Sequence, residues 1–91
     1  MNINYSNPLQ LLYLSIISNK ESQKENNNLR KKAIYKNNFY LFQNKAIHAL
    51  NKLRYTISDD NFMIVALKYR DILIANNYSN SEIQELFSEY F

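Results

Sequence analysis

The chain has 91 residues, 46% of them hydrophobic and 21% charged, with a net charge of +3, which predicts one soluble domain with a small core. It has no cysteine and a single histidine, which excludes a disulfide framework and a thiolate nucleophile and argues against a histidine-rich metal site. It has no glycine either, so it lacks glycine-rich phosphate loops, and we expect no enzyme, no metal and no cofactor.

The first predicted helix begins at Pro8. Asn7 precedes it, and this pairing is typical of a helix N-cap followed by the first helical residue. Leu9, Leu12 and Ile16 then recur at intervals of three and four residues, which places them on one side of a helix. Further apolar residues widen that side, so we expect the helix to be mostly buried.

Asparagine is expected to mark the ends of the elements, because the chain has fifteen asparagines and no glycine. After glycine, asparagine is the residue that most readily adopts the positive φ of helix ends and tight turns. Its clusters, at Asn19 and at residues 26–28, 37–38 and 76–77, divide the chain into four or five segments with helical spacing.

Residues 22–55 are predicted to be helical, as one helix or as two. Ser22 and Glu25 have the spacing of a capping box, which favours a helix start there. The asparagines at residues 37–38 weaken the helical pattern, and whether the helix stops there stays open. The positions predicted to face inward are Leu29, Ala33, Ile34, Phe39, Phe42, Ala46, Ala49, Leu50 and Leu53.

Two further helices are predicted in the C-terminal half. Ser58 is the expected N-cap of the first, since two aspartates follow it in the first turn. Apolar residues between positions 62 and 74 form so wide an arc that we expect this helix to lie at the centre of the fold. The last helix is expected to begin near Ser79 or Ser81, with Glu82 in its first turn.

The predicted fold class is all-α: an antiparallel four-helix bundle, with room for a fifth short helix, in a single helical domain over residues 1–91. No apolar run is long enough to span a membrane and no charged leader precedes the first one. We therefore expect a cytoplasmic, largely monomeric protein that is not integral to a membrane. The predicted core consists of Leu12, Ile16, Phe42, Leu50, Val65, Tyr69, Leu73, Leu86 and Phe87.

Charge is unevenly distributed along the chain. Residues 1–19 carry none, residues 20–54 carry nine basic and two acidic side chains, and residues 55–91 carry two basic and six acidic ones. A basic patch is predicted from Arg30, Lys31, Lys32, Lys36, Lys45 and Lys52. Such a patch is typical of a solvated helix face and equally offers a surface to phosphates, acidic lipids or an acidic protein. Nucleic acid is the specific alternative, with Tyr35 or Tyr40 available to stack on bases.

The candidate partner-binding residues lie near the end of the chain. Glu82, Glu85 and Glu89 share one strip of the last helix, for which a solvated face is the plain interpretation. Tyr78 lies between predicted helices, and tyrosine is enriched at protein interfaces. We predict that these four residues contact a protein partner. His48 has neither a nucleophile nor an orienting partner beside it in the pattern, so we expect it to be exposed.

Several short stretches between residues 9 and 75 share a pattern with one known family. They are Leu11-Leu12-Tyr13 with Ile16, Lys45-Ala46-Ile47-His48, and Ile57-Ser58 leading to Tyr69-Arg70-Asp71-Ile72. With the basic middle segment, they resemble the small immunity proteins of class II bacteriocin producers, of the pediocin-like or enterocin A type. The resemblance implies a cytoplasmic, non-enzymatic helical bundle that protects its host by binding the bacteriocin-occupied sugar-transport receptor. The chain departs from the family at its end, where an amphipathic helix replaces a flexible tail.

Three functions are consistent with the sequence. The leading one is a non-catalytic protein-interaction module, in concrete form a bacteriocin immunity protein whose partner is the membrane receptor with its bacteriocin. The second is a helical nucleic-acid-binding or ribonucleoprotein component that uses the basic segment 30–52. The third is a small structural subunit of a larger assembly.

Overall fold

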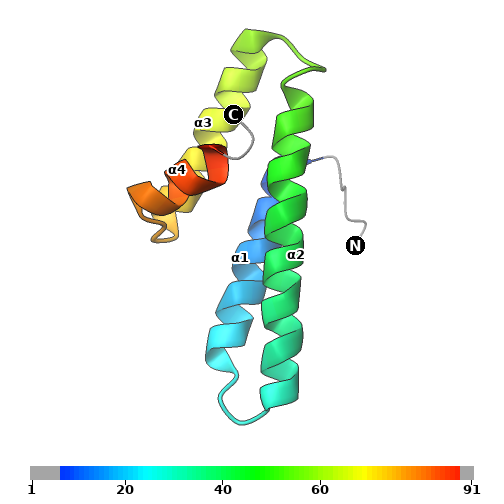
Figure 1. The fold of residues 1–91 in the computed structure, drawn as a ribbon, viewed down its shortest axis with the longest axis vertical. Coiled ribbons are helices and arrows are strands. Elements are labelled where there is room, and N and C mark those ends of the chain that lie inside the picture. Colours follow the sequence, from blue (N-terminus) through cyan, green and yellow to red (C-terminus); the bar gives the residue numbers. More distant parts are fainter. Residues whose placement is uncertain (1–6, 89–91) are drawn as a thin grey trace.

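Four helices make up the described part of the chain, which is residues 7–88 of a computed structural model (Figure 1). They are α1 (Pro8–Lys24), α2 (Leu29–Leu53), α3 (Asp59–Ala75) and α4 (Asn80–Ser88). Residues 7–88 contain no strand, so the all-α class predicted from the apolar spacing is confirmed.

The helices form a hairpin with a smaller second layer. α1 and α2 run antiparallel, side by side, and α3 returns from the far end of α2 (Figure 1). α4 lies across the lower part of α3. α1 packs mainly against α2, whereas α3 approaches the hairpin less closely. The predicted antiparallel four-helix bundle is thus confirmed in its helical class and not in its arrangement, and residues 7–88 include no fifth helix.

Local capping chemistry determines where three of the helices begin. The Asn7 side chain accepts hydrogen bonds from the first turn of α1, where Pro8 takes the first position. The Ser58 hydroxyl accepts one from the backbone N–H of Asn61 in α3. α4 begins directly after Ser79, whose hydroxyl also accepts from the first turn. These caps satisfy N–H groups that have no partner within the helix, and they confirm the predicted starts.

The predicted helix start at Ser22 is wrong. α1 continues through Ser22, whose side chain is buried, and Asn28 caps α2 instead by accepting a backbone hydrogen bond from its first turn. Ser15 lies four residues after Leu11, and Ser22 lies seven residues after Ser15, so Ser22 continues the buried face of α1. Packing this longer face of α1 against α2 is more favourable than starting a new helix at Ser22, although Ser22 and Glu25 have the spacing of a capping box.

α2 is a single helix of 25 residues that runs without a break through residues 37–38. Asparagine in a helix interior costs only about 0.5 kcal/mol relative to alanine, so two of them do not end a helix whose later turns carry a buried apolar face. Phe39 and Ala46, which follow them, are buried. The region therefore contains one helix after the α1–α2 turn.

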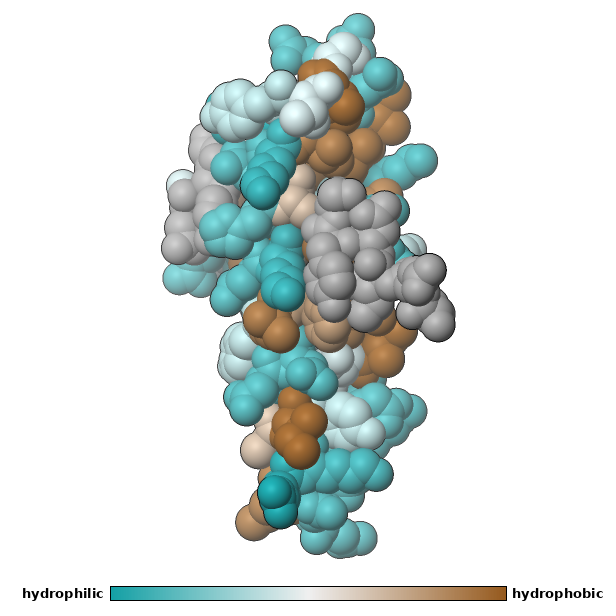
Figure 2. All heavy atoms as spheres, turned by 90° about the vertical axis from the view of Figure 1, so that its right-hand side faces the viewer, coloured by the Kyte–Doolittle hydropathy of each residue, from teal (hydrophilic) through white to brown (hydrophobic). Residues whose placement is uncertain are grey.

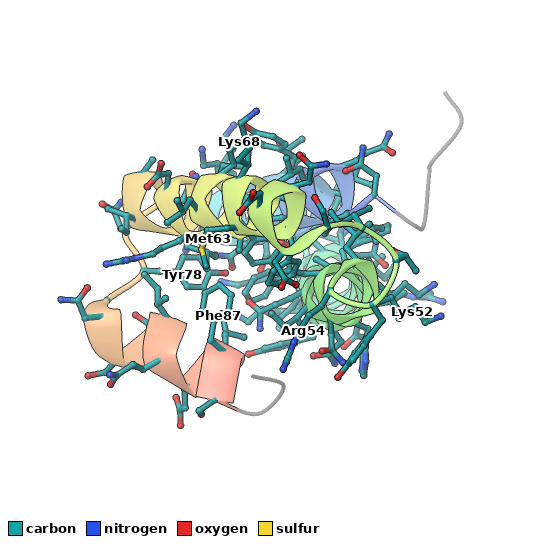
Figure 3. The ribbon with its side chains drawn as sticks, turned by 90° about the horizontal axis from the view of Figure 1, so that it is seen from above. Lys52, Arg54, Met63, Lys68, Tyr78 and Phe87 are labelled. Atoms are coloured by element: carbon teal, nitrogen blue, oxygen red, sulfur yellow. The ribbon has the colours of Figure 1, made fainter. Side chains whose placement is uncertain are left out.

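The core lies where the hairpin meets α3 and α4. Its buried members are Leu11, Leu12, Ile16, Ala46, Ile47, Ala49, Leu50, Tyr69, Leu73 and Ile83. The predicted core residues Phe42, Val65, Leu86 and Phe87 are partly buried and pack against this cluster. Seen from above, Tyr78 and Phe87 point into the space between α3, α4 and the hairpin, whereas Lys52 and Lys68 point outward (Figure 3). Side chains thus join the second layer to the hairpin.

Some apolar residues that were predicted to face inward are exposed. Leu29 is 79% exposed and Ile34 is 53% exposed, because the first turns of α2 lie at the hairpin end, where neither α3 nor α4 covers them (Figure 1). The prediction that α3 lies at the centre is also wrong. It flanks the hairpin and leaves about half of the surface of Met63, Ile64 and Leu67 exposed, so its wide apolar arc is only partly covered.

Candidate functional site

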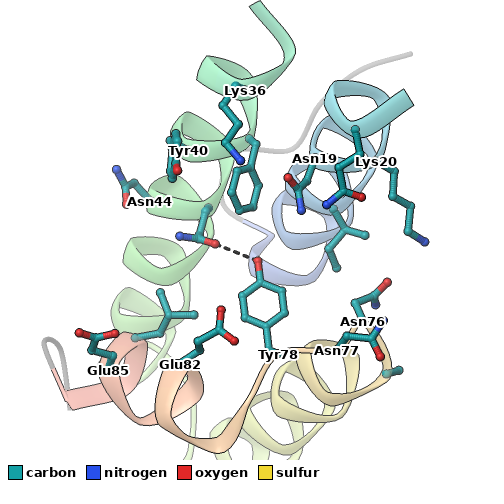
Figure 4. A pocket seen from close by; sticks show the side chains of 16 residues that line it. Asn19, Lys20, Lys36, Tyr40, Asn44, Asn76, Asn77, Tyr78, Glu82 and Glu85 are labelled. Carbon is teal, nitrogen blue, oxygen red and sulfur yellow. Dashed lines mark hydrogen bonds between the residues drawn. The ribbon is translucent and has the colours of Figure 1, made fainter. Parts of the chain in front are cut away.

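A cleft of about 840 Å³ lies between the hairpin and the turn that joins α3 to α4 (Figure 4). α1 and α2 form its upper walls, and the turn and α4 close it from below. Tyr78, Glu82 and Glu85, which were predicted to bind a partner, line this cleft together with Lys36 of the predicted basic patch. Candidates that the sequence assigned to two separate surfaces therefore meet at one site.

The end of α3 determines where Tyr78 lies. Asn77 adopts a φ of 69°, the left-handed conformation that glycine usually supplies at this position. The backbone N–H of Tyr78 donates to the carbonyl oxygen of Leu73 at 3.1 Å, and the N–H of Asn77 donates to that of Ile74 at 3.1 Å. This pair of hydrogen bonds is the Schellman motif, and it confirms that the asparagines at 76–77 end a helix.

Tyr78 links the α3–α4 turn to α2. Its hydroxyl donates to the side-chain oxygen Oε1 of Gln43 at 2.9 Å, across 35 positions of sequence (Figure 4). Burial raises the pKa of the Tyr78 hydroxyl, and the nearby Glu82 carboxylate raises it further, so the hydroxyl keeps its proton and remains a donor at neutral pH. Tyr78, which we expected to be exposed and to contact a partner, is half-buried, and its hydroxyl is bonded to Gln43 within the fold.

Replacing Tyr78 by phenylalanine is expected to lower the free energy of unfolding by about 0.5–1.5 kcal/mol, because the Gln43 oxygen loses its donor. Urea denaturation followed by circular dichroism measures this. Tyr55→Phe is the matched control, since Tyr55 is 76% exposed, and its stability should equal that of the wild type. Equal urea midpoints for both variants would show that this hydrogen bond does not hold the turn to α2.

Glu82 has a structural role as well as a place in the cleft. Its carboxylate accepts a hydrogen bond from the backbone N–H of Ser79 at 3.0 Å, and its own N–H donates to the Ser79 hydroxyl at 3.1 Å. These reciprocal bonds form the capping box of α4. The bond from the Ser79 backbone is the main reason that the pKa of Glu82 is lowered, with the Ser79 side chain second. Glu82 is therefore a stable anion at the lower wall.

The upper wall is positively charged. Lys36 of α2 and Lys20 of α1 belong to it, and Glu82 and Glu85 belong to the wall formed by α4; the Lys20 side chain extends away from the two glutamates (Figure 4). The Lys36 ammonium lies 5.5 Å from the ring centroid of Phe39 and 5.6 Å from that of Tyr40, within the range of cation–π attraction. The rings hold this cation at the rim, so the cleft presents opposite charges on opposite walls.

Side-chain amides are the commonest polar groups in the cleft. They come from Asn19 and Gln23 of α1, Gln43 and Asn44 of α2, and Asn76 and Asn77 of the turn. The Asn19 oxygen Oδ1 is buried and accepts no hydrogen bond from the residues described. A buried acceptor without a donor is unfavourable, so this oxygen is an unsatisfied polar group beneath the surface of the cleft.

The walls of the cleft present groups that can bind a ligand. A general acid needs a carboxyl pKa raised toward neutrality, and the pKa of Glu82 moves in the opposite direction. Within residues 7–88, no group of three or more histidine, cysteine, aspartate or glutamate side chains is placed to hold a metal ion. What the walls offer is amide donors and acceptors, two signs of charge and an apolar floor that includes Ile16, Phe39 and Leu86.

The rest of the predicted basic patch lies outside the cleft. Arg30, Lys31 and Lys32 occupy the first turn of α2, where Lys31 lies 4.0 Å from Glu25, and Lys45 and Lys52 are exposed farther along. The six basic residues therefore do not form one face. Glu89, the fourth predicted partner-binding residue, lies outside the described residues.

Sequence reasoning missed the amides of the cleft. Asn19, Gln43 and Asn44 lie inside helices, where asparagine and glutamine carry no distinct pattern, and only long-range packing brings them together. The asparagines at 76–77 were interpreted as a helix end, which they are, without their place in the site. A comparison of the chain with protein-family models, curated proteins and solved structures finds no match.

Proposed function

We propose that this chain is a non-catalytic interaction protein that binds a segment of polypeptide in its cleft. The observation that carries the proposal is the convergence on one cleft of six amide side chains and of opposite charges on facing walls. A side-chain amide is a donor and an acceptor at once, so it pairs with both the N–H and the C=O of a peptide group. The apolar floor accommodates the side chains of such a segment.

The concrete form of this proposal is a bacteriocin immunity protein, which rests on the resemblance over about residues 9–75. Its partner would then be the membrane receptor with its bacteriocin, and the chain would act as a cytoplasmic monomer. Such a protein recognises its partner and leaves the toxin intact, which agrees with a site that supplies binding groups and with a sequence that has no cysteine thiolate.

Expressing the chain in a bacteriocin-sensitive strain tests the immunity form. We expect resistance to at least one class II bacteriocin, with the toxin recovered undegraded from the medium. Resistance should be lost in Lys36→Glu/Glu85→Lys, which exchanges the charges of the two cleft walls without altering the net charge. The matched control is Lys68→Glu/Asp71→Lys, the same exchange on the exposed side of α3, and it should remain protective.

A second measurement separates peptide binding from immunity. Peptides selected from a random phage-displayed library should bind the wild type and the α3 control and should lose at least tenfold in affinity for the cleft variant. Sensitivity to every bacteriocin tested would refute immunity alone. Peptides that bind the cleft variant as tightly as the wild type would refute the cleft as the binding site.

A further inference from the structure

α2 carries the whole predicted basic patch and no acidic residue. Its 25 residues include one arginine and five lysines, so the helix has a charge of +6, not counting His48. Because the whole chain has a net charge of +3, all its other residues together have a charge of −3. α2 is therefore the most positively charged of the four helices.

Five residues of α2 follow one line along the helix. Arg30, Ile34, Leu41, Lys45 and Lys52 recur at intervals of four and seven, which brings them to the same side within a narrow sector. We call this line the outward face of α2. All five are exposed, and from the first to the last the face extends over roughly 33 Å, at 1.5 Å per residue.

The outward face combines cations with aliphatic side chains that remain about half exposed among the described residues. Ile34 is 53% exposed and Leu41 is 49% exposed, and cationic residues precede and follow them on the same line. Figure 2, which views the molecule from the α2 side, shows separate apolar patches within a hydrophilic surface. A helix that lies in the plane of a membrane surface also combines exposed apolar side chains with lysine and arginine, there on adjoining faces and here along one line.

We propose that the outward face of α2 binds the surface of an anionic phospholipid bilayer. Its cations meet lipid phosphates, while Ile34 and Leu41 enter the boundary between head groups and acyl chains. The helix lies on the membrane and does not cross it, since no helix among residues 7–88 is long and apolar enough for a span.

The composition of the face favours lipid over nucleic acid. Sequence-tolerant binding of nucleic acid uses several aromatic side chains on which successive bases stack, whereas this side of α2 carries only one aromatic ring, the imidazole of His48, seven residues after Leu41. Of the two tyrosines predicted to stack, Tyr40 lines the cleft and Tyr35 is half-buried. Exposed isoleucine and leucine contribute nothing to phosphate binding, whereas a bilayer accommodates them.

The face and the cleft use different sides of α2. Lys36, Phe39 and Gln43 line the cleft, and none of them belongs to the outward face. A molecule resting on a membrane through its outward face would keep the cleft open to a polypeptide partner. Membrane binding therefore does not depend on the proposed function of the cleft, and each can fail without the other.

Co-sedimentation with vesicles tests the proposal. The folded chain should bind vesicles of equal parts phosphatidylglycerol and phosphatidylcholine at low salt, bind vesicles of pure phosphatidylcholine far more weakly, and dissociate as salt is raised. In Arg30→Gln/Lys45→Gln/Lys52→Gln the partition coefficient should fall roughly a hundredfold, because each cation near an anionic surface contributes about fivefold. Circular dichroism checks that the variant is folded.

Two further variants identify the surface. Lys24→Gln/Lys68→Gln/Arg70→Gln also neutralises three cations, none of which belongs to the outward face. It should reduce the partition coefficient by less than tenfold. Ile34→Ser/Leu41→Ser should weaken binding severalfold with the salt dependence unchanged. Failure of the wild type to bind anionic vesicles, or equal losses in both charge variants, would overturn the proposal. So would binding of single-stranded RNA by the wild type, abolished by the outward-face variant, without any binding to vesicles.

Discussion

Leu50→Ala is expected to lower the free energy of unfolding by about 2–5 kcal/mol. The Leu50 side chain is completely buried in the cluster where the hairpin meets α3 and α4, so its removal costs the transfer of apolar atoms from water and leaves a cavity. Small domains have a total stability of about 5–15 kcal/mol, so this loss is a large fraction of the whole. Urea denaturation at 25 °C, followed by circular dichroism, measures it.

Leu29→Ala is the matched control because it removes the same atoms from the same helix. Leu29 is 79% exposed, and alanine has a high helix propensity, so the control should differ from the wild type by less than about 0.5 kcal/mol. A Leu50→Ala variant that is as stable as the control would mean that the hairpin and the second layer are not packed as described.

Helix ends were predictable where a few adjacent residues determine them. Asn7 with Pro8, Ser58 with its two aspartates, and Ser79 with Glu82 all form the caps that their spacing predicts. Each cap needs only hydrogen bonds within one helical turn, so it does not depend on the rest of the fold. The end of α3 at residues 76–77 was predictable for the same reason.

The errors arose where tertiary packing outweighs a local pattern. Ser22 matches a capping box and is instead buried on the face that α1 turns to α2, which no local signal reveals. The apolar arc of α3 was interpreted as a sign of a central helix, yet α3 lies beside the hairpin and keeps Met63 and Leu67 half-exposed. Apolar periodicity indicates which side of a helix can be buried, and not how much of it a small chain can cover.

The candidate site was predictable in part. Tyr78, Glu82 and Glu85 were singled out from their positions near the last helix, and all three line the cleft. The wall of the cleft formed by α1 and α2 was not predicted. Asn19 and Lys36 line it only because α1 pairs with α2 and because α3 folds back beside this hairpin. The hydrogen bond from Tyr78 to Gln43 depends on the same long-range arrangement.

The second large effect is expected at high pH and arises from Tyr69. This side chain is almost completely buried, and its ring meets that of Phe87 edge to face, with centroids 6.0 Å apart. Burial is the main reason that the pKa of its hydroxyl is raised far above its ordinary value near 10, and Tyr78 adds to the shift. The folded state therefore holds this proton more tightly than the unfolded chain does.

The sign of the pH dependence follows from that difference. The contribution of the protonated Tyr69 hydroxyl to the free energy of unfolding is fully present below about pH 10. It falls as pH rises toward the pKa of the folded state, with a slope that approaches about 1.4 kcal/mol per pH unit. Urea denaturation between pH 8 and pH 11.5 should show the fall in the wild type and in Tyr13→Phe, whose tyrosine is half-exposed, and a much smaller fall in Tyr69→Phe. An equally steep fall in Tyr69→Phe would assign the alkaline loss to other groups, with Tyr78 the first to test, since its pKa is raised by burial as well.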